Sequence, residues 1–131
     1  MQRMPNVLLA IIGYLRSYFS LSDVDNIAVD LRGFDDGLVW IKVSPSPSPG
    51  SEPVKGVVFN PSFDFNIYGP SVDVVEPLSR EVMLALSKML NYSGSDIVVT
   101  RVDVTTPYDL TDLVNGSPRY VLSATLLCRQ K

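Results

Sequence analysis

The sequence contains no histidine and only one cysteine, Cys128, among its 131 residues. The lack of histidine removes the commonest general base and the commonest metal ligand, and it rules out zinc sites of the Cys/His type. One cysteine cannot form a disulfide within the chain, which favours assembly in a reducing compartment. Any catalytic site would therefore have to be built from carboxylates, lysines and hydroxyls.

Charge is also scarce, since charged residues make up 19% of the chain and the net charge is -3. The 11 lysines and arginines are scattered and form no run, so nothing in the charge pattern favours nucleic-acid binding. Hydrophobic residues make up 46%, which is enough to bury a core without disulfides or metal. The length predicts a single domain over residues 1–131, and the low charge suggests that partners cover part of its surface.

No long hydrophobic run is present, because the apolar stretch from Val7 to Ile12 is too short to cross a bilayer. Tyr14 and Arg16 interrupt it, and no small-residue cleavage site follows cleanly, so a signal peptide is disfavoured. Apolar residues at helical spacing instead predict an amphipathic helix over 7–19, capped by Asn6.

Alternating apolar residues predict a β-hairpin over 27–43, with a turn at 33–37. The Ser/Pro-rich segment 44–53 is predicted to be an exposed loop, because proline lacks the N–H that a sheet requires. The sheet is expected to resume over 54–67, with a break at Asn60-Pro61-Ser62.

The second helix is predicted to start near Asp73, which has capping-box spacing to Glu76, and Pro77 is expected within its first turn. Two further strands, 97–106 and 119–129, are predicted on either side of a long polar loop, with Asp103 and Arg119 as a possible pair across the sheet. This order predicts an α+β fold, with two helices packed on one face of a mostly antiparallel mixed sheet.

The residues that could carry chemistry have simpler structural roles. Asp35-Asp36 and the pair Asp109 and Asp112 could bind a divalent cation, but solvated turns are the favoured interpretation. Trp40 is expected in the core more than as a partner anchor. The aromatic residues of 63–68 could stack on bases, but no lysine or arginine accompanies them on this strand, which disfavours nucleic-acid binding. The sequence therefore predicts no catalytic, cofactor or metal site.

Two stretches carry a family resemblance. They are "FDFNIYGPS" at 63–71, which leads directly into the helical pattern of 74–90, and "PRYVLSATLLCR" at 118–129. Together with the helix-first layout, which covers most of the chain, they resemble the tail terminator and tail-completion proteins of long-tailed bacteriophages. The Ser/Pro-rich segment 44–53 departs from that pattern.

The resemblance implies a structural virion protein, assembled in the host cytoplasm, that forms a hexameric ring at the head-proximal end of the tail tube. The ring would end tube polymerisation and join the tail to the head connector, and DNA would pass through its lumen without sequence-specific binding. It implies no enzymatic activity, no cofactor and no membrane contact. The expected partners are further copies of the chain, the tail tube protein and the head–tail connector or stopper protein.

The candidate contact residues lie in the two predicted loops: Pro45, Pro47, Pro49, Tyr108, Leu110 and Leu113. The last three could instead fold back onto the core. Within the same machinery, the alternatives are a connector stopper or other neck protein, and a tail tube subunit. From other classes, they are a small hydrolase or nuclease-like enzyme, which would need clustered carboxylates, and a small nucleic-acid-binding adaptor.

Overall fold

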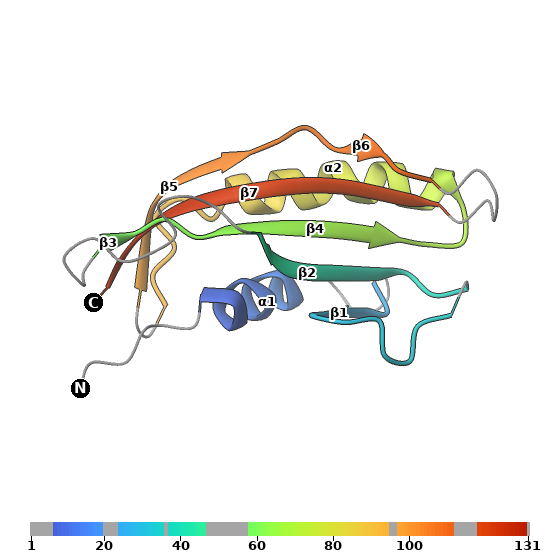
Figure 1. Cartoon of the computed structure of the whole chain (residues 1–131), viewed down its shortest axis with the longest axis horizontal. Coiled ribbons are helices and arrows are strands. Elements are labelled where there is room, and N and C mark those ends of the chain that lie inside the picture. The colour runs from blue at the N-terminus through green and yellow to red at the C-terminus, as the bar shows by residue number, and fades with distance from the viewer. Residues whose placement is uncertain are drawn as a thin grey trace.

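The computed structural model describes residues 7–19, 24–35, 37–46, 58–94, 97–111 and 118–130 (Figure 1). Its helices are α1 (Val7–Tyr18) and α2 (Val72–Ser87). Its strands are β1 (Asn26–Ala28), β2 (Trp40–Ser46), β3 (Val58–Phe59), β4 (Ser62–Tyr68), β5 (Ile97–Val104), β6 (Tyr108–Asp109) and β7 (Arg119–Gln130). The expected α+β class is confirmed.

The sheet is organised around β7, which pairs antiparallel with four other strands. On one side lie β4, with Phe65 opposite Leu122, and β3, with Phe59 opposite Cys128. On the other side lie β5 and β6. Each of these two pairs, β3 with β4 and β5 with β6, is one extended segment of chain with an interruption. The interruption between β3 and β4, at Asn60-Pro61, falls within the predicted break at Asn60-Pro61-Ser62. β7 therefore has a long partner segment along each of its two edges.

The first two strands are parallel, so the predicted hairpin is wrong. Asn26 pairs with Trp40 and Ala28 with Lys42, so both strands run in the same direction. Parallel neighbours cannot be joined by a tight turn. The chain makes a wide connection instead, in which Phe34 packs edge-on against Trp40 at 5.8 Å between ring centroids.

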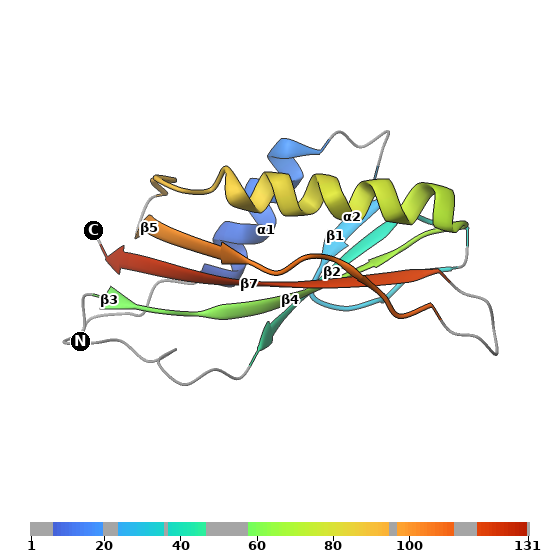
Figure 2. The same cartoon turned by 90° about the horizontal axis from the view of Figure 1, so that it is seen from above.

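Both helices lie on one side of the sheet, as predicted (Figure 2). Apolar and polar residues alternate along β4, and its apolar residues face the core and are almost fully buried: Phe63, Phe65 and Ile67. The two helices are also joined to each other, because the Tyr14 hydroxyl donates to the carbonyl oxygen of Ala85 at 2.6 Å. Burial, reinforced by the nearby Tyr18, raises the pKa of Tyr14.

The start of α2 differs from the predicted capping box. The N-cap residue is Ser71, without a side-chain capping bond, and Asp73 already lies inside the helix. Pro77 is consequently the sixth helical residue and lies beyond the first turn. The helix tolerates it because Pro77 is exposed and only its own N–H is missing from the ladder.

Part of the Ser/Pro-rich segment is a strand, which corrects the prediction of a loop over 44–53. Pro45 pairs with Phe63 within β2, while 47–53, including Pro47 and Pro49, lies outside the described residues. β1 covers β2 only as far as Lys42, and beyond it no described strand pairs with that side of β2. A proline is compatible with such a position, because its missing N–H can point away from the neighbouring strand.

A bulge divides β5 and reverses the faces that a single alternation along this strand would give. The register shifts between Val99 and Arg101, so Thr100 is an extra residue. Beyond the bulge, Val102 and Val104 lie on the same side as Val99 and pack partly against the core. A single uninterrupted alternation would have placed Val102 and Val104 on the face opposite to Val99.

Gly69 marks the tight junction between β4 and α2. A Cβ atom at Gly69 would lie 2.6 Å from Cγ2 of Val75, which is fully buried. We expect Gly69→Ala to lower the free energy of unfolding by about 1–3 kcal/mol in urea denaturation, because the core must shift to accept the methyl group. Gly13→Ala in α1 is the control: nothing lies within 4 Å of its Cβ position, and alanine should stabilise the helix by about 0.5–1 kcal/mol. Equal effects at both sites would contradict this packing.

Candidate interaction surface

Tyr108 and Leu110 lie together on the outer border of the sheet, which we call the β6 border. Tyr108 pairs with Val121 of β7, and the N–H of Leu110 donates to the carbonyl oxygen of Arg119 at 2.8 Å. Their side chains are 51% and 43% exposed, so neither folds back onto the core. They remain candidates for contact with a partner.

Of the other predicted contact residues, Pro45 is the one that lies in the described part of the chain, and it does not join them. Pro45 is exposed, but it lies in β2, and β4 and β7 separate it from the β6 border. Leu113, like Pro47 and Pro49, lies outside the described residues. The structure therefore brings together two of the six predicted residues.

The opposite border, at β1, is closed by side chains. The carbonyl oxygen of Ile27 accepts from Nε and Nη2 of Arg16, at 3.1 and 2.8 Å. The N–H of Ile27 donates to Oδ1 of Asn26 at 2.9 Å. Next to this short strand, Val29 is 46% exposed. The β1 border thus offers apolar surface, but its central residue already has partners for both backbone groups.

Arg119 does not face Asp103, so that predicted pair is wrong. Asp103 lies opposite Thr125, whereas Arg119 lies opposite Tyr68. Nε and Nη2 of Arg119 both donate to Oδ1 of Asn66, at 3.0 and 2.6 Å, and the guanidinium lies 5.9 Å from the centre of the Tyr68 ring. The alternation of β4 places Asn66 and Tyr68 together on the face away from the helices. This alternation is the signal in the sequence that Asn66 and Tyr68 could share a partner.

Trp40 belongs to the same face but is not an exposed anchor. It is only 4% exposed, and its Nε1–H donates to the carbonyl oxygen of Asp30 at 3.0 Å. Phe34 covers it and also contacts Tyr68, at 5.4 Å between ring centroids. The favoured interpretation of Trp40 as a buried aromatic is confirmed.

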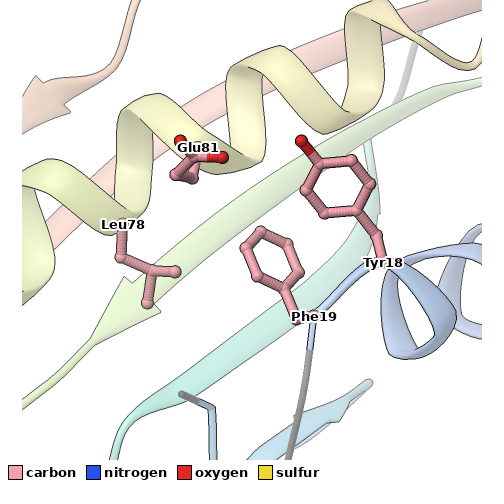
Figure 3. Close-up of a pocket in the computed structure, with 4 residues that line it drawn as sticks. All are labelled: Tyr18, Phe19, Leu78 and Glu81. Atoms are coloured by element: carbon pink, nitrogen blue, oxygen red, sulfur yellow. The ribbon is translucent and has the colours of Figure 1, made fainter.

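A hollow of about 270 Å³ lies between the end of α1 and the side of α2. Figure 3 shows Tyr18 and Phe19 from the α1 side facing Leu78 and Glu81 of α2. Its described walls are mostly apolar, and Glu81 supplies the one carboxylate among them. Such a hollow suits an apolar group better than it suits proton transfer.

Asp35 and Asp109, the two described acidic candidates for metal binding, make local turn bonds. Oδ1 of Asp35 accepts from the N–H of Gly37 at 2.9 Å, and Oδ1 of Asp109 accepts from the N–H of Thr111 at 2.7 Å. The hydrogen bonds from Thr111 lower the pKa of Asp109. Asp36 and Asp112 lie outside the described residues. In the part of the chain that is described, no group of three or more metal-ligand side chains occurs.

Cys128 is fully buried in β7, and burial raises its pKa from 9.0 to about 11. Since only the thiolate reacts, we expect the native protein to resist thiol-modifying reagents at neutral pH and to react at once when unfolded in urea. Stability should fall as pH rises from 9 towards 11, because the unfolded thiol loses its proton first. A native reaction rate near that of the unfolded chain, followed by absorbance, would contradict the buried position.

No protein-family model and no curated protein matches the sequence. Within the described ranges, neither helix is long and apolar enough to cross a membrane. The candidate residues for contact with a partner are the exposed apolar residues at the two borders of the sheet.

Proposed function

We propose that the chain is a structural subunit that forms a hexameric ring at the head-proximal end of a bacteriophage tail tube. The ring ends tube polymerisation and joins the tail to the head connector. The observation that carries this proposal is the pair of exposed apolar surfaces at opposite borders of one sheet, Tyr108 with Leu110 at β6 and Val29 next to β1.

A ring needs this kind of arrangement, because each subunit must use one surface on one side and a different surface on the other. The β6 border and the β1 border differ in chemistry. The β6 border has an exposed aromatic ring and an exposed leucine. The β1 border has the exposed Val29, next to a strand in which the backbone groups of Ile27 are bonded to side chains. Unlike surfaces favour head-to-tail contact between copies. The helix-covered sheet supplies a rigid body between them.

The layout that carries the phage resemblance also supports the proposal. The aromatic strand β4 ends at Tyr68 and is joined to α2 through Gly69, and β7 completes the sheet beside it. In this proposal the chain performs no catalysis and binds no cofactor. DNA passes through the ring without sequence-specific contact.

The test adds purified protein to tail tubes from the phage that encodes it, and examines them by electron microscopy. We expect rings on one end of the tubes and a halt in tube growth. The variant Tyr108→Ala with Leu110→Ala should lose capping, because it removes the apolar surface of the β6 border. The control Leu84→Ala changes a leucine that is 47% exposed on α2 and should still cap.

Protein that never associates with tubes would overturn the proposal. Binding to the head connector without binding to tubes would assign the chain to the neck as a stopper instead. Loss of capping by Leu84→Ala to the same degree as by the double variant would show that the β6 border is not the contact surface.

A further inference from the structure

Among the described residues, the outer edge of β5 is covered along its first half only. There, residues 91–94 form a short antiparallel partner: the N–H of Asn91 donates to the carbonyl oxygen of Val99, and the N–H of Val99 donates to that of Tyr92, both at 2.9 Å. From Arg101 to Val104, no other strand of the described chain pairs with this side. Figure 1 shows β5 and β6 as the upper border of the sheet.

The register identifies which backbone groups point outward. The N–H of Thr105 donates to the carbonyl oxygen of Ser123 at 2.8 Å, towards β7. In an antiparallel ladder, alternate residues direct their N–H and C=O to the same side. Asp103 and Arg101 therefore bond towards β7, while Val102 and Val104 direct both backbone groups away from the sheet. Within the described residues, those outward groups have no backbone partner.

The side chains along this edge carry both signs of charge. Proteins commonly protect an exposed edge with charged side chains, proline, a β-bulge or a covering loop. The uncovered stretch of β5 follows the bulge at Thr100 and carries two opposite charges, Arg101 and Asp103, whose side chains are 69% and 61% exposed and lie 3.1 Å apart, so a strand with the opposite order of charges can match them. Val102 and Val104, between and beside them, are only half-buried.

We propose that this edge binds a second copy of the chain, with the two β5 strands antiparallel about a two-fold axis at Val102. In that register, Arg101 of each copy lies opposite Asp103 of the other, so two unlike-charge pairs form. Val102 of one copy exchanges both backbone hydrogen bonds with Val102 of the other. The exposed parts of Val102 and Val104 are covered at the same time.

The order of charges along β5, Arg101 before Asp103, favours a second copy of the chain as the partner of this edge. Directly opposed side chains of neighbouring strands lie about 4.5–5.5 Å apart, so unlike charges attract and like charges repel there. A strand that reads Arg, apolar, Asp is complementary to itself only when the second copy runs antiparallel with the apolar residue on the axis. A parallel copy in register would oppose like charges.

This two-fold contact is a different contact from that of the proposed ring, although both lie on the β5 and β6 side of the sheet. It joins like surfaces, whereas a ring joins unlike ones. It is a property of the free protein and remains whether or not the chain caps tail tubes. Its test therefore uses the full chain alone, by sedimentation over a range of protein concentrations at low salt.

The wild type should form dimers. Arg101→Asp and Asp103→Arg should each weaken dimerisation by about tenfold or more, because both cross-strand pairs become repulsive. An equal mixture of these two variants should dimerise again, because every Asp then faces an Arg. The chain with both changes should also dimerise. Arg80→Asp is the matched control, since it reverses a 63% exposed arginine paired with Glu76 on α2, and it should leave dimerisation unchanged.

Three results would overturn the proposal. The first is a wild type that stays monomeric at every concentration. The second is a pair of single variants that dimerise as well as the wild type. The third is a mixture of the two single variants that fails to associate although each is folded by circular dichroism.

Discussion

Replacing Phe65 with alanine is expected to lower the free energy of unfolding by about 3–5 kcal/mol in urea denaturation. Phe65 is fully buried in the middle of β4, with Val43 of β2 opposite on one side and Leu122 of β7 on the other. Its ring lies at the centre of the sheet beneath the helices. Deleting it leaves a cavity that these neighbours cannot fill without moving their strands.

The control for Phe65→Ala is Tyr108→Ala, which removes an aromatic ring that is 51% exposed. We expect the free energy of unfolding of this control to change by no more than about 0.5 kcal/mol, because an exposed ring contributes little to the folded state. If Phe65→Ala lowered the free energy of unfolding by as little as Tyr108→Ala, β4 would not lie at the centre of the core.

Replacing Pro77 with alanine is expected to raise the free energy of unfolding by about 2 kcal/mol. Proline inside a helix costs about 3 kcal/mol relative to alanine, because it lacks the N–H and crowds the preceding turn. Pro77 is the sixth residue of α2 and is exposed, so no core contact is lost on replacement. Alanine makes the unfolded chain more flexible, which offsets about 0.4–1 kcal/mol of the gain.

The control for Pro77→Ala is Arg80→Ala, one turn further along the same helix. It removes an ion pair with Glu76 whose two side chains are 63% and 37% exposed, and it should lower the free energy of unfolding by about 0.3–0.5 kcal/mol. Calorimetry and urea denaturation report both changes. A destabilised Pro77→Ala protein would mean that the pyrrolidine ring makes a contact that alanine cannot replace.

The parts of the fold that could be predicted are those set by neighbours in sequence. The alternation that buries Phe65 and Ile67 is visible in the sequence, as is the helical stripe that buries Val82 and Leu86. The parallel pairing of β1 with β2 could not be predicted, because it depends on where Asn26 meets Trp40 across the sheet. The same holds for a proline inside β2, which is possible only where β1 has ended.

The candidate surfaces divide in the same way. Tyr108 and Leu110 stood out as apolar residues in a polar stretch, and both are exposed. The open edge at Val102 could not be predicted, because the bulge at Thr100 changes which side of β5 each later residue faces. One extra residue in a strand reverses every side chain after it, and the sequence alone does not reveal it.

The position of β7 has a consequence for how the protein is made. β4 and β5 both pair with this strand, yet residues 119–130 come after both of them along the chain. While they are still inside the ribosome, the emerging segments have helices and half-sheets but no central partner. Native pairing must then wait for translation of that stretch, and until then the exposed apolar faces are prone to aggregation.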